Sequence, residues 1–386
     1  MKKYIFYLLI IALLFPIPVI AQEDFVDSTG ELQEEYAKGI VLDVLSEELD
    51  MEIGAGLISD QQLLEIEITS GPFRGQVFTT ENVTSDNPAY DLWLSKGDKV
   101  LLYIEALDGK FINGYVMDFA RDTVLYLLIA LFILSLLVIG RMQGFKAVFT
   151  LGFTLLFIAK FMLPMLFKGY NPVLLALLTG VVVTAFTLLI IGGVTKKSFA
   201  AIIGTGGGLL IAAVISIIVG KVTNLRGLSG EEAQMLLYIP QEIQFDFQGL
   251  LFAGIMIGAL GAVMDVSISI ASAMEEIRTV AQRLSFKELF KSGMNVGKDV
   301  MGTMSNTLIL AYTGTSIPLL LLMMAYEQPF IKLINMDFLA TELVRALSGS
   351  IGLILAIPIT AFVAAILMRP KAKDTRDTLA NKEISY

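Results

Sequence analysis

The sequence predicts an all-α polytopic membrane bundle of seven core spans, preceded by a signal sequence and a small extracytoplasmic β-rich domain of barrel or OB-like type. Three observations predict this class. The mean hydropathy of the chain is +0.72, and 55% of its 386 residues are hydrophobic, which is outside the usual range of soluble proteins. Long apolar segments follow residue 118. The stretch before it is polar, with alternating apolar residues.

The composition excludes several kinds of active site. The chain has no cysteine and no histidine, so thiolate chemistry, Ser-His-Asp hydrolysis and HExxH metal chemistry are ruled out. The formal net charge is −9, and no basic patch suggests nucleic-acid binding. We expect no enzyme activity, no cofactor, no metal site and no nucleic-acid partner.

The N-terminus carries a targeting segment. Lys2 and Lys3 precede an apolar run that ends in small residues at 19–21, as in a cleavable signal peptide. An uncleaved N-terminal anchor over residues 1–21 is the alternative. Either one would export the segment that follows.

Residues 22–118 are predicted to form the extracytoplasmic β domain. Alternating apolar residues bounded by turn residues predict four to six short strands. The clearest strands are 39–45, 62–68, 75–79 and 99–105. Nothing in this domain resembles a catalytic site, so a sensor, a ligand-capture module and a structural cap are all open.

Residues 119–368 are predicted to form a seven-helix membrane domain. Each apolar segment is long enough for a hydrocarbon core of about 30 Å. The segments are 123–140, 147–167, 172–194, 199–220, 248–272, 302–325 and 343–368.

Basic residues in the loops predict the orientation. They concentrate in loops 141–146, 195–198 and 275–301 and in the basic tail 369–386, while the intervening loops hold few. The positive-inside rule therefore places the tail in the cytoplasm and the first core span with its start outside. This agrees with an exported β domain.

One cytoplasmic loop has its own helical signal. Ser285 and Glu288 have the spacing of a capping box, and phenylalanines alternate with lysines after it. We expect an amphipathic segment at 277–298 that lies on the membrane surface, as an anchor or as a partner-binding helix.

The fifth core span carries the strongest functional signal. Its small and polar residues recur every three or four positions, so they share one helical face. They are Gly254, Gly258, Gly261, Asp265, Ser269, Ser272 and Glu276. A carboxylate at the bilayer centre costs about 2.5–3.5 kcal/mol on insertion scales. Asp265 therefore needs shelter, water, a proton or a function.

The sixth core span repeats this pattern. Asp299, Thr303 and Asn306 lie where an antiparallel hairpin would bring them to the depth of Asp265. Two polar stripes could then line one shared interface. The alternative is helix packing through small residues, with Asp265 hydrogen-bonded to Asn306.

Three further intramembrane features have structural explanations. Lys160 can extend its stem to the membrane surface. The glycine run at 204–208 indicates a helix break or a close helix crossing, and Glu342 with Arg345 can pair one turn apart.

Several long motifs resemble those of the YibE/F-like family of bacterial multispan membrane proteins. They lie at residues 251–254, 261–266, 269–273, 290–299, 301–312 and 349–353 with Pro358, and in the β domain at 70–75, Asn82 and 96–100. Lys298 is a small departure, because arginine is expected there. The resemblance implies an exported β domain with a seven-span unit, and it implies little about activity. The motif residues it carries over are Asp265, Ser269, Ser272, Asp299, Thr303 and Asn306.

These features predict a transporter or permease of the bacterial cell membrane, with a polar path between core spans five and six. Its substrate would be a small solute or ion, and ion or proton coupling is one option. The sequence has no nucleotide-binding motif, so energy would come from a gradient or a separate ATPase. The alternative is a membrane assembly factor or a sensor that uses residues 22–118. Besides the lipid bilayer, a second copy or another membrane protein is the expected partner.

Overall fold

The computed structural model describes residues 32–52, 58–84, 87, 89, 91–239 and 244–369. They form two compact units, divided between Ser135 and Leu136. The predicted signal segment and residues 370–386 of the predicted tail lie outside the described residues.

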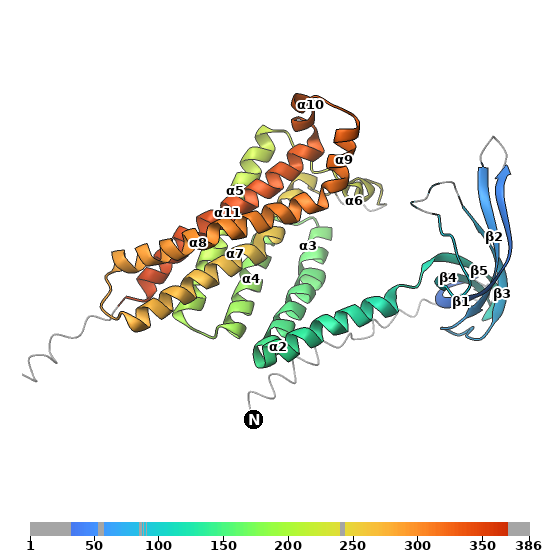
Figure 1. The fold of residues 1–386 in the computed structure, drawn as a ribbon, viewed down its shortest axis with the longest axis horizontal. Coiled ribbons are helices and arrows are strands. Elements are labelled where there is room, and N and C mark those ends of the chain that lie inside the picture. The colour runs from blue at the N-terminus through green and yellow to red at the C-terminus, as the bar shows by residue number, and fades with distance from the viewer. Residues whose placement is uncertain are drawn as a thin grey trace, which may run out of the picture. The chain divides into compact units, whose positions relative to one another are not determined.

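The first unit contains one antiparallel five-stranded sheet with the strand order β3-β2-β1-β4-β5 (Figure 1). The strands are β1 (Leu32–Glu52), β2 (Ile58–Ile68), β3 (Val77–Val83), β4 (Lys99–Leu107) and β5 (Lys110–Phe119). Alternate residues of β2 and β4, such as Leu64, Ile66, Leu102 and Ile104, are fully buried and form the core. This alternation is what a half-buried sheet requires.

The sheet curls into a half-barrel. β3 and β5 are its two edge strands, yet Phe78 of β3 lies directly over Gly114 of β5. A Cβ at Gly114 would stand 2.6 Å from the Phe78 ring, so glycine is needed for this approach. The edges do not pair through their backbones, and the predicted barrel is therefore only half formed.

The second unit is helical. Its elements are α2 (Asp122–Phe157, which begins in the first unit), η1 (Ile158–Met162), α3 (Leu163–Phe167), α4 (Pro172–Ile191), α5 (Lys196–Val222), α6 (Glu231–Met235), η2 (Leu236–Tyr238), α7 (Phe247–Val280), α8 (Phe286–Thr315), α9 (Ile317–Ala325), α10 (Phe330–Ile334) and α11 (Asp337–Leu367). Among the described residues, five helices are long and apolar enough to cross a membrane, or six if α8 and α9 form one broken span. This indicates a membrane-embedded protein.

The predicted count of seven spans is not established. The predicted segments 123–140 and 147–167 belong to one helical stretch of 46 residues, Asp122–Phe167. Its backbone breaks at Arg141, where φ is 48° and ψ is −123°. Beyond this break Gly144 packs tightly against the Leu136 carbonyl, so the helix bends sharply there.

Glycines set the closest helix crossing of the bundle. A Cβ at Gly208 of α5 would stand 2.8 Å from the Ala356 Cβ and 2.9 Å from the Gly352 carbonyl oxygen of α11. α5 is continuous through this run, so the glycines allow close packing and do not break the helix. Of the two interpretations of residues 204–208, the close crossing is correct.

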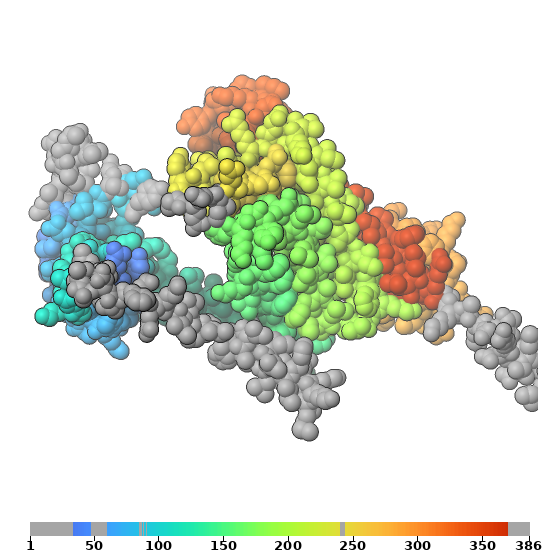
Figure 2. Space-filling model, turned by 180° about the vertical axis from the view of Figure 1, so that it is seen from behind, coloured from blue at the N-terminus to red at the C-terminus, as the bar shows by residue number. Residues whose placement is uncertain are grey.

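Loops that the charge pattern placed on one side do lie at one end of the bundle. Lys197 and Glu275 form an ion pair of 2.8 Å, which joins the start of α5 to the end of α7. α4 and α5 contribute much of the bundle surface seen from behind (green to yellow-green, Figure 2), and α7 and α8 lie toward the viewer in Figure 1.

The segment at 277–298 differs from the prediction. The capping box is present, with the Ser285 backbone N–H donating to Glu288 Oε2 at 2.8 Å. The helix that begins there continues to Thr315, however, so residues 286–298 are the first turns of α8. Gly293 and Gly297 seat these turns against α7 and α11, which explains why they do not form a separate surface helix.

Candidate functional site

α7 lies at the centre of the helical unit and contacts α4, α5, α8 and α11. Asp246 caps its start, because the carboxylate Oδ1 accepts from the Gly249 backbone N–H at 2.8 Å. Large apolar side chains such as Ile255, Met256 and Ile270 are fully buried against the neighbouring helices. Only a narrow stripe of the helix stays uncovered.

The predicted stripe is this uncovered face. All of α7 is described, and before its last two residues its exposed positions are Gly254, Gly258, Gly261, Asp265, Ser269 and Glu276, with Ser272 half-buried. Val280, at the very end, is the one exposed large apolar side chain of α7. The sequence spacing therefore correctly predicted that these residues share a face. The face points away from the core of the bundle.

The predicted residues of α8 are also exposed. Asp299, Thr303 and Asn306 all lie on uncovered parts of that helix. Thr303 Oγ1 donates to the carbonyl of Val300 at 2.9 Å, so its hydroxyl is satisfied within the helix. Both polar sets thus lie on the surface of the unit.

Packing contacts place the two sets at matching heights. Gly297 of α8 lies against Ile270 of α7, and Tyr312 reaches Gly258. The helices are antiparallel, so Asp265 lies level with the turn that holds Thr303. The predicted common depth is therefore borne out by the packing.

The predicted shared interface between the two stripes is not formed. Contacts between α7 and α8 are made by other residues, such as Met274 against Gly293. Within the described residues no hydrogen bond or ion pair joins Asp265 to Asn306. A dry Asp265–Asn306 seam is thus absent from this arrangement.

A polar cluster that the sequence did not connect lies beside Gly258. Arg345 and Glu342 form the predicted ion pair, with Nη1 and Oε1 3.3 Å apart. The Tyr312 hydroxyl interacts electrostatically with both charges. Its oxygen and Glu342 Oε2 are buried without a hydrogen-bond partner among the described residues. The cluster places three hydrogen-bonding side chains at one end of the α7 stripe.

Several hydroxyls are buried inside the bundle. Thr184 of α4, Thr205 of α5 and Ser267 of α7 are fully buried, and none has a hydrogen-bond partner in the described part of the chain. Lys160, by contrast, is exposed within the π-helical turn η1. An uncovered Lys160 is compatible with its predicted extension toward the membrane surface.

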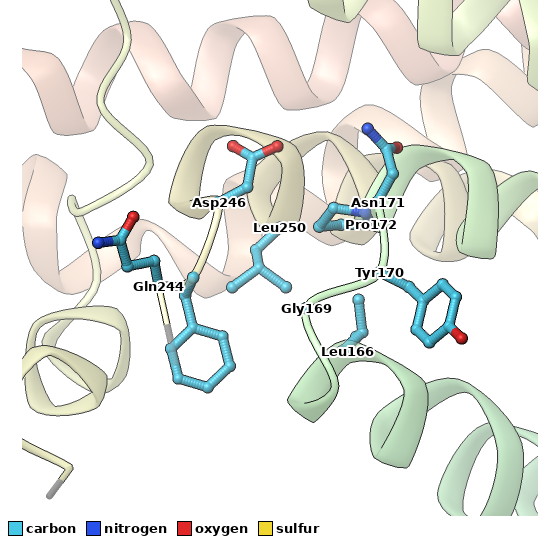
Figure 3. A pocket seen from close by; sticks show the side chains of 9 residues that line it. Leu166, Gly169, Tyr170, Asn171, Pro172, Gln244, Asp246 and Leu250 are labelled. Atoms are coloured by element: carbon cyan, nitrogen blue, oxygen red, sulfur yellow. The ribbon is translucent and has the colours of Figure 1, made fainter. Parts of the chain in front are cut away.

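A small cavity opens where α3, α4 and α7 meet (Figure 3). Its volume is 210 Å³. Leu166, Gly169, Tyr170, Asn171, Pro172, Gln244, Phe245, Asp246 and Leu250 line it. Asn171 and Asp246 cap the starts of α4 and α7, so two helix N-termini and two polar caps share this opening.

A larger open cavity of 650 Å³ lies between the end of α5 and the start of α11. Arg226, Gln234, Asn335 and Asp337 are among its lining residues. Within the described residues no group of three or more Asp, Glu, His or Cys side chains could hold a metal ion.

Comparison with known proteins gives two matches. The family described as YibE/F-like protein matches residues 128–370, and the YibE/F family N-terminal domain matches residues 43–119. The search of curated proteins gave no match. No solved structure matches the chain either.

Proposed function

The chain belongs to the YibE/F-like family, and we propose that it is a membrane transporter or permease whose path follows the polar face of α7. Asp265 and Ser269 would contact the transported solute or ion, and Asp299, Thr303 and Asn306 of α8 would border the same path. The uncovered stripe of α7 is the observation that carries this proposal.

A lipid-facing surface explains this stripe poorly. Asp265 at the middle of a span would cost about 2.5–3.5 kcal/mol against hydrocarbon, unless water or protein surrounds it. Glycine and serine also offer lipid tails little apolar area. The other long helices show what lipid-facing surfaces look like in this protein, since α11 exposes Leu347, Ile351 and Leu355.

A broken helix beside the stripe gives further support. α8 and α9 meet at an angle of 59°, and Pro318 begins α9 two residues after the break at Ser316. Discontinuous helices occur at the binding sites of many transporters. Tyr312 lies one turn before this break and contacts the stripe at Gly258. The Tyr312–Glu342–Arg345 cluster would then lie at one end of the path.

The orientation remains part of the proposal. Basic residues gather at the end of the bundle where Lys197 pairs with Glu275, and we assign this end to the cytoplasm. The cavity between Asn171 and Asp246 would then open outside, on the side of the β unit. The proposed location is the bacterial cell membrane.

Proton flux tests whether Asp265 belongs to an ion path. The purified protein would be placed in vesicles that contain the pH dye pyranine, with an imposed pH gradient and potassium and valinomycin to hold the potential. We expect the gradient to collapse faster than in protein-free vesicles, and Asp265→Asn to slow it by at least about tenfold, as expected when a proton relay group is removed.

The matched control is Glu231→Gln, which removes an exposed carboxylate of α6. It should leave the flux unchanged. If the wild-type protein collapses the gradient no faster than empty vesicles, protons do not use this face.

A further inference from the structure

Three tyrosines form a ladder across the sheet of the first unit. Tyr36 of β1 pairs directly with Tyr103 of β4, which pairs with Tyr115 of β5. The ring centroids of Tyr36 and Tyr103 are 5.8 Å apart at an interplanar angle of 63°. Those of Tyr103 and Tyr115 are 6.3 Å apart at 35°. The rings are tilted against one another and do not form a flat stack.

The ladder lies on the outward face of the sheet. Leu102 and Ile104, on either side of Tyr103, are fully buried on the opposite face. The exposed fractions of Tyr36 and Tyr115 are 66% and 41%. Core packing therefore does not account for three aromatic residues in one row. This proposal rests on the first unit alone and is independent of the transport path.

A row of acidic residues runs beside the ladder. Glu34 pairs directly with Glu105 across β1 and β4, and Asn113 of β5 completes the row. Like charges directly opposite each other destabilise a sheet. In the part of the chain that the structure describes, neither glutamate forms an ion pair. The facing carboxylates lack a cation.

The nearby lysines do not supply this cation. Lys38 lies on the other side of Tyr36, and its ammonium group is paired with Asp122. Lys110 pairs with Leu107 at the hairpin beyond Glu105, and it has no ion pair among the described residues. The net charge of the two central rows is therefore negative.

Tyr103 is held in place by its acidic neighbours. A hydrogen bond with Glu34, some burial and the charges of Glu34 and Glu105 raise the pKa of Tyr103 to about 12. Its hydroxyl therefore stays protonated at all ordinary pH values and donates to the Glu34 carboxylate. The ring remains neutral and fixed between its two partners.

We propose that this face of the sheet binds organic ammonium ions, with short aliphatic polyamines as the ligand class. Tilted aromatic rings attract ammonium groups through the electrons of their faces. One ammonium of a polyamine can lie over the Tyr103 and Tyr115 rings while another lies between Glu34 and Glu105. The aliphatic chain between them can cover the exposed ring surfaces. A metal ion fits less well, because the site offers only two carboxylates.

Calorimetry of the full-length protein in nanodiscs tests this proposal, with spermidine as the probe. We expect saturable binding by the wild-type protein. Tyr115→Ala should weaken it about threefold, as should Glu105→Gln, and the double variant about tenfold. Tyr115→Phe keeps the ring and should bind nearly as well as the wild type.

The matched control is Glu65→Gln, which removes one charge from the outward face of β2. It should change the affinity less than twofold. Equal weakening by Glu65→Gln and Glu105→Gln would show non-specific charge attraction and overturn the proposal. Absence of wild-type binding at millimolar spermidine would overturn it as well. The emission of Trp93, the only tryptophan of the chain, reports whether each variant keeps the fold of this unit.

Discussion

α7 and α11 are long apolar helices of one bundle, and their exposed faces are opposite in character. Between its ends α11 exposes only leucine, isoleucine and phenylalanine, at Leu343, Leu347, Ile351, Leu355, Phe362 and Ile366. α7 exposes glycine, serine and carboxylate residues instead. Both helices bury about half of their most apolar stretch, so burial does not explain the difference. The comparison teaches that the environment outside each helix differs: lipid fits α11, whereas α7 requires water or a polar surface.

The two helices can be compared at the same depth. Gly297 of α8 contacts both Ile270 and Ile357, so α7 and α11 run side by side in parallel. Ala259 and Gly349 are opposite each other, which brings Leu355 level with Asp265. Substitutions at these two positions therefore differ in the face they test and not in depth.

The largest expected effect comes from exchanging the characters of the two faces. Leu355→Asp places a carboxylate in lipid and should destabilise the folded protein by about 3 kcal/mol. Asp265→Leu removes a carboxylate from a hydrated face and should cost less than about 1 kcal/mol. Thermal unfolding in detergent and the yield in membranes would measure both. Similar losses for the two variants would mean that Asp265 is buried in the working protein.

A second, smaller effect separates packing glycines from path glycines. Gly352 of α11 has the Gly208 carbonyl oxygen and the Ala212 Cβ 2.7 Å from the position of an added Cβ. Gly352→Leu should force α5 and α11 apart and cost about 1–3 kcal/mol in unfolding free energy.

The matched variant is Gly261→Leu. No atom lies within 4 Å of the Cβ that it would add, so the unfolding free energy should stay nearly unchanged. It should impair flux without impairing stability. A loss of stability as large as that of Gly352→Leu would show that Gly261 is a packing residue.

The smallest expected effect lies outside the bundle and defines the pH range for these comparisons. A hydrogen bond from Arg121 at 2.6 Å, followed by one from the Phe119 backbone N–H, holds the pKa of Asp118 below its usual 3.8. Both side chains are about half exposed, so the pair contributes at most about 0.5 kcal/mol.

This contribution has a defined sign. Because the folded state has the lower pKa, the pair stabilises the protein above pH 3.8 and the stabilisation is lost as the pH falls below it. The difference in unfolding free energy between wild type and Arg121→Ala should thus be present at neutral pH and disappear in acid. A difference that does not change with pH would contradict this origin.

Much of the fold could be predicted from the sequence, because local patterns specify it. Alternation predicted four of the five strands, and apolar length predicted the helices. β5 was missed because Asn113 and Gly114 interrupt its pattern and bulges shift its pairing with β4. The amphipathic turns at 286–298 looked like a surface helix, since sequence alone does not show that Gly293 and Gly297 seat them on α7 and α11.

The candidate site could be predicted only in part. Helical spacing placed Asp265, Ser269 and Ser272 on one face, and chain order gave the depth of Thr303. Periodicity says nothing about the direction in which a face points, so the outward direction of the stripe could not be foreseen. The approach of Tyr312 to Glu342 and Arg345 depends on the packing of α8 against α11, which leaves no signal in either segment.

Cysteine accessibility tests most directly whether the α7 face is a hydrated path. The chain has no native cysteine, so Ser269→Cys and Leu355→Cys each carry a single thiol. A membrane-impermeant cationic thiosulfonate would be added from either side of sealed vesicles. We expect Ser269→Cys to react from at least one side, at least about tenfold faster than Leu355→Cys, because thiolate forms in water and not in lipid. Equal protection of the two thiols, or a disulfide between two copies at Ser269→Cys, would show that the stripe is a covered interface and contradict the proposed path.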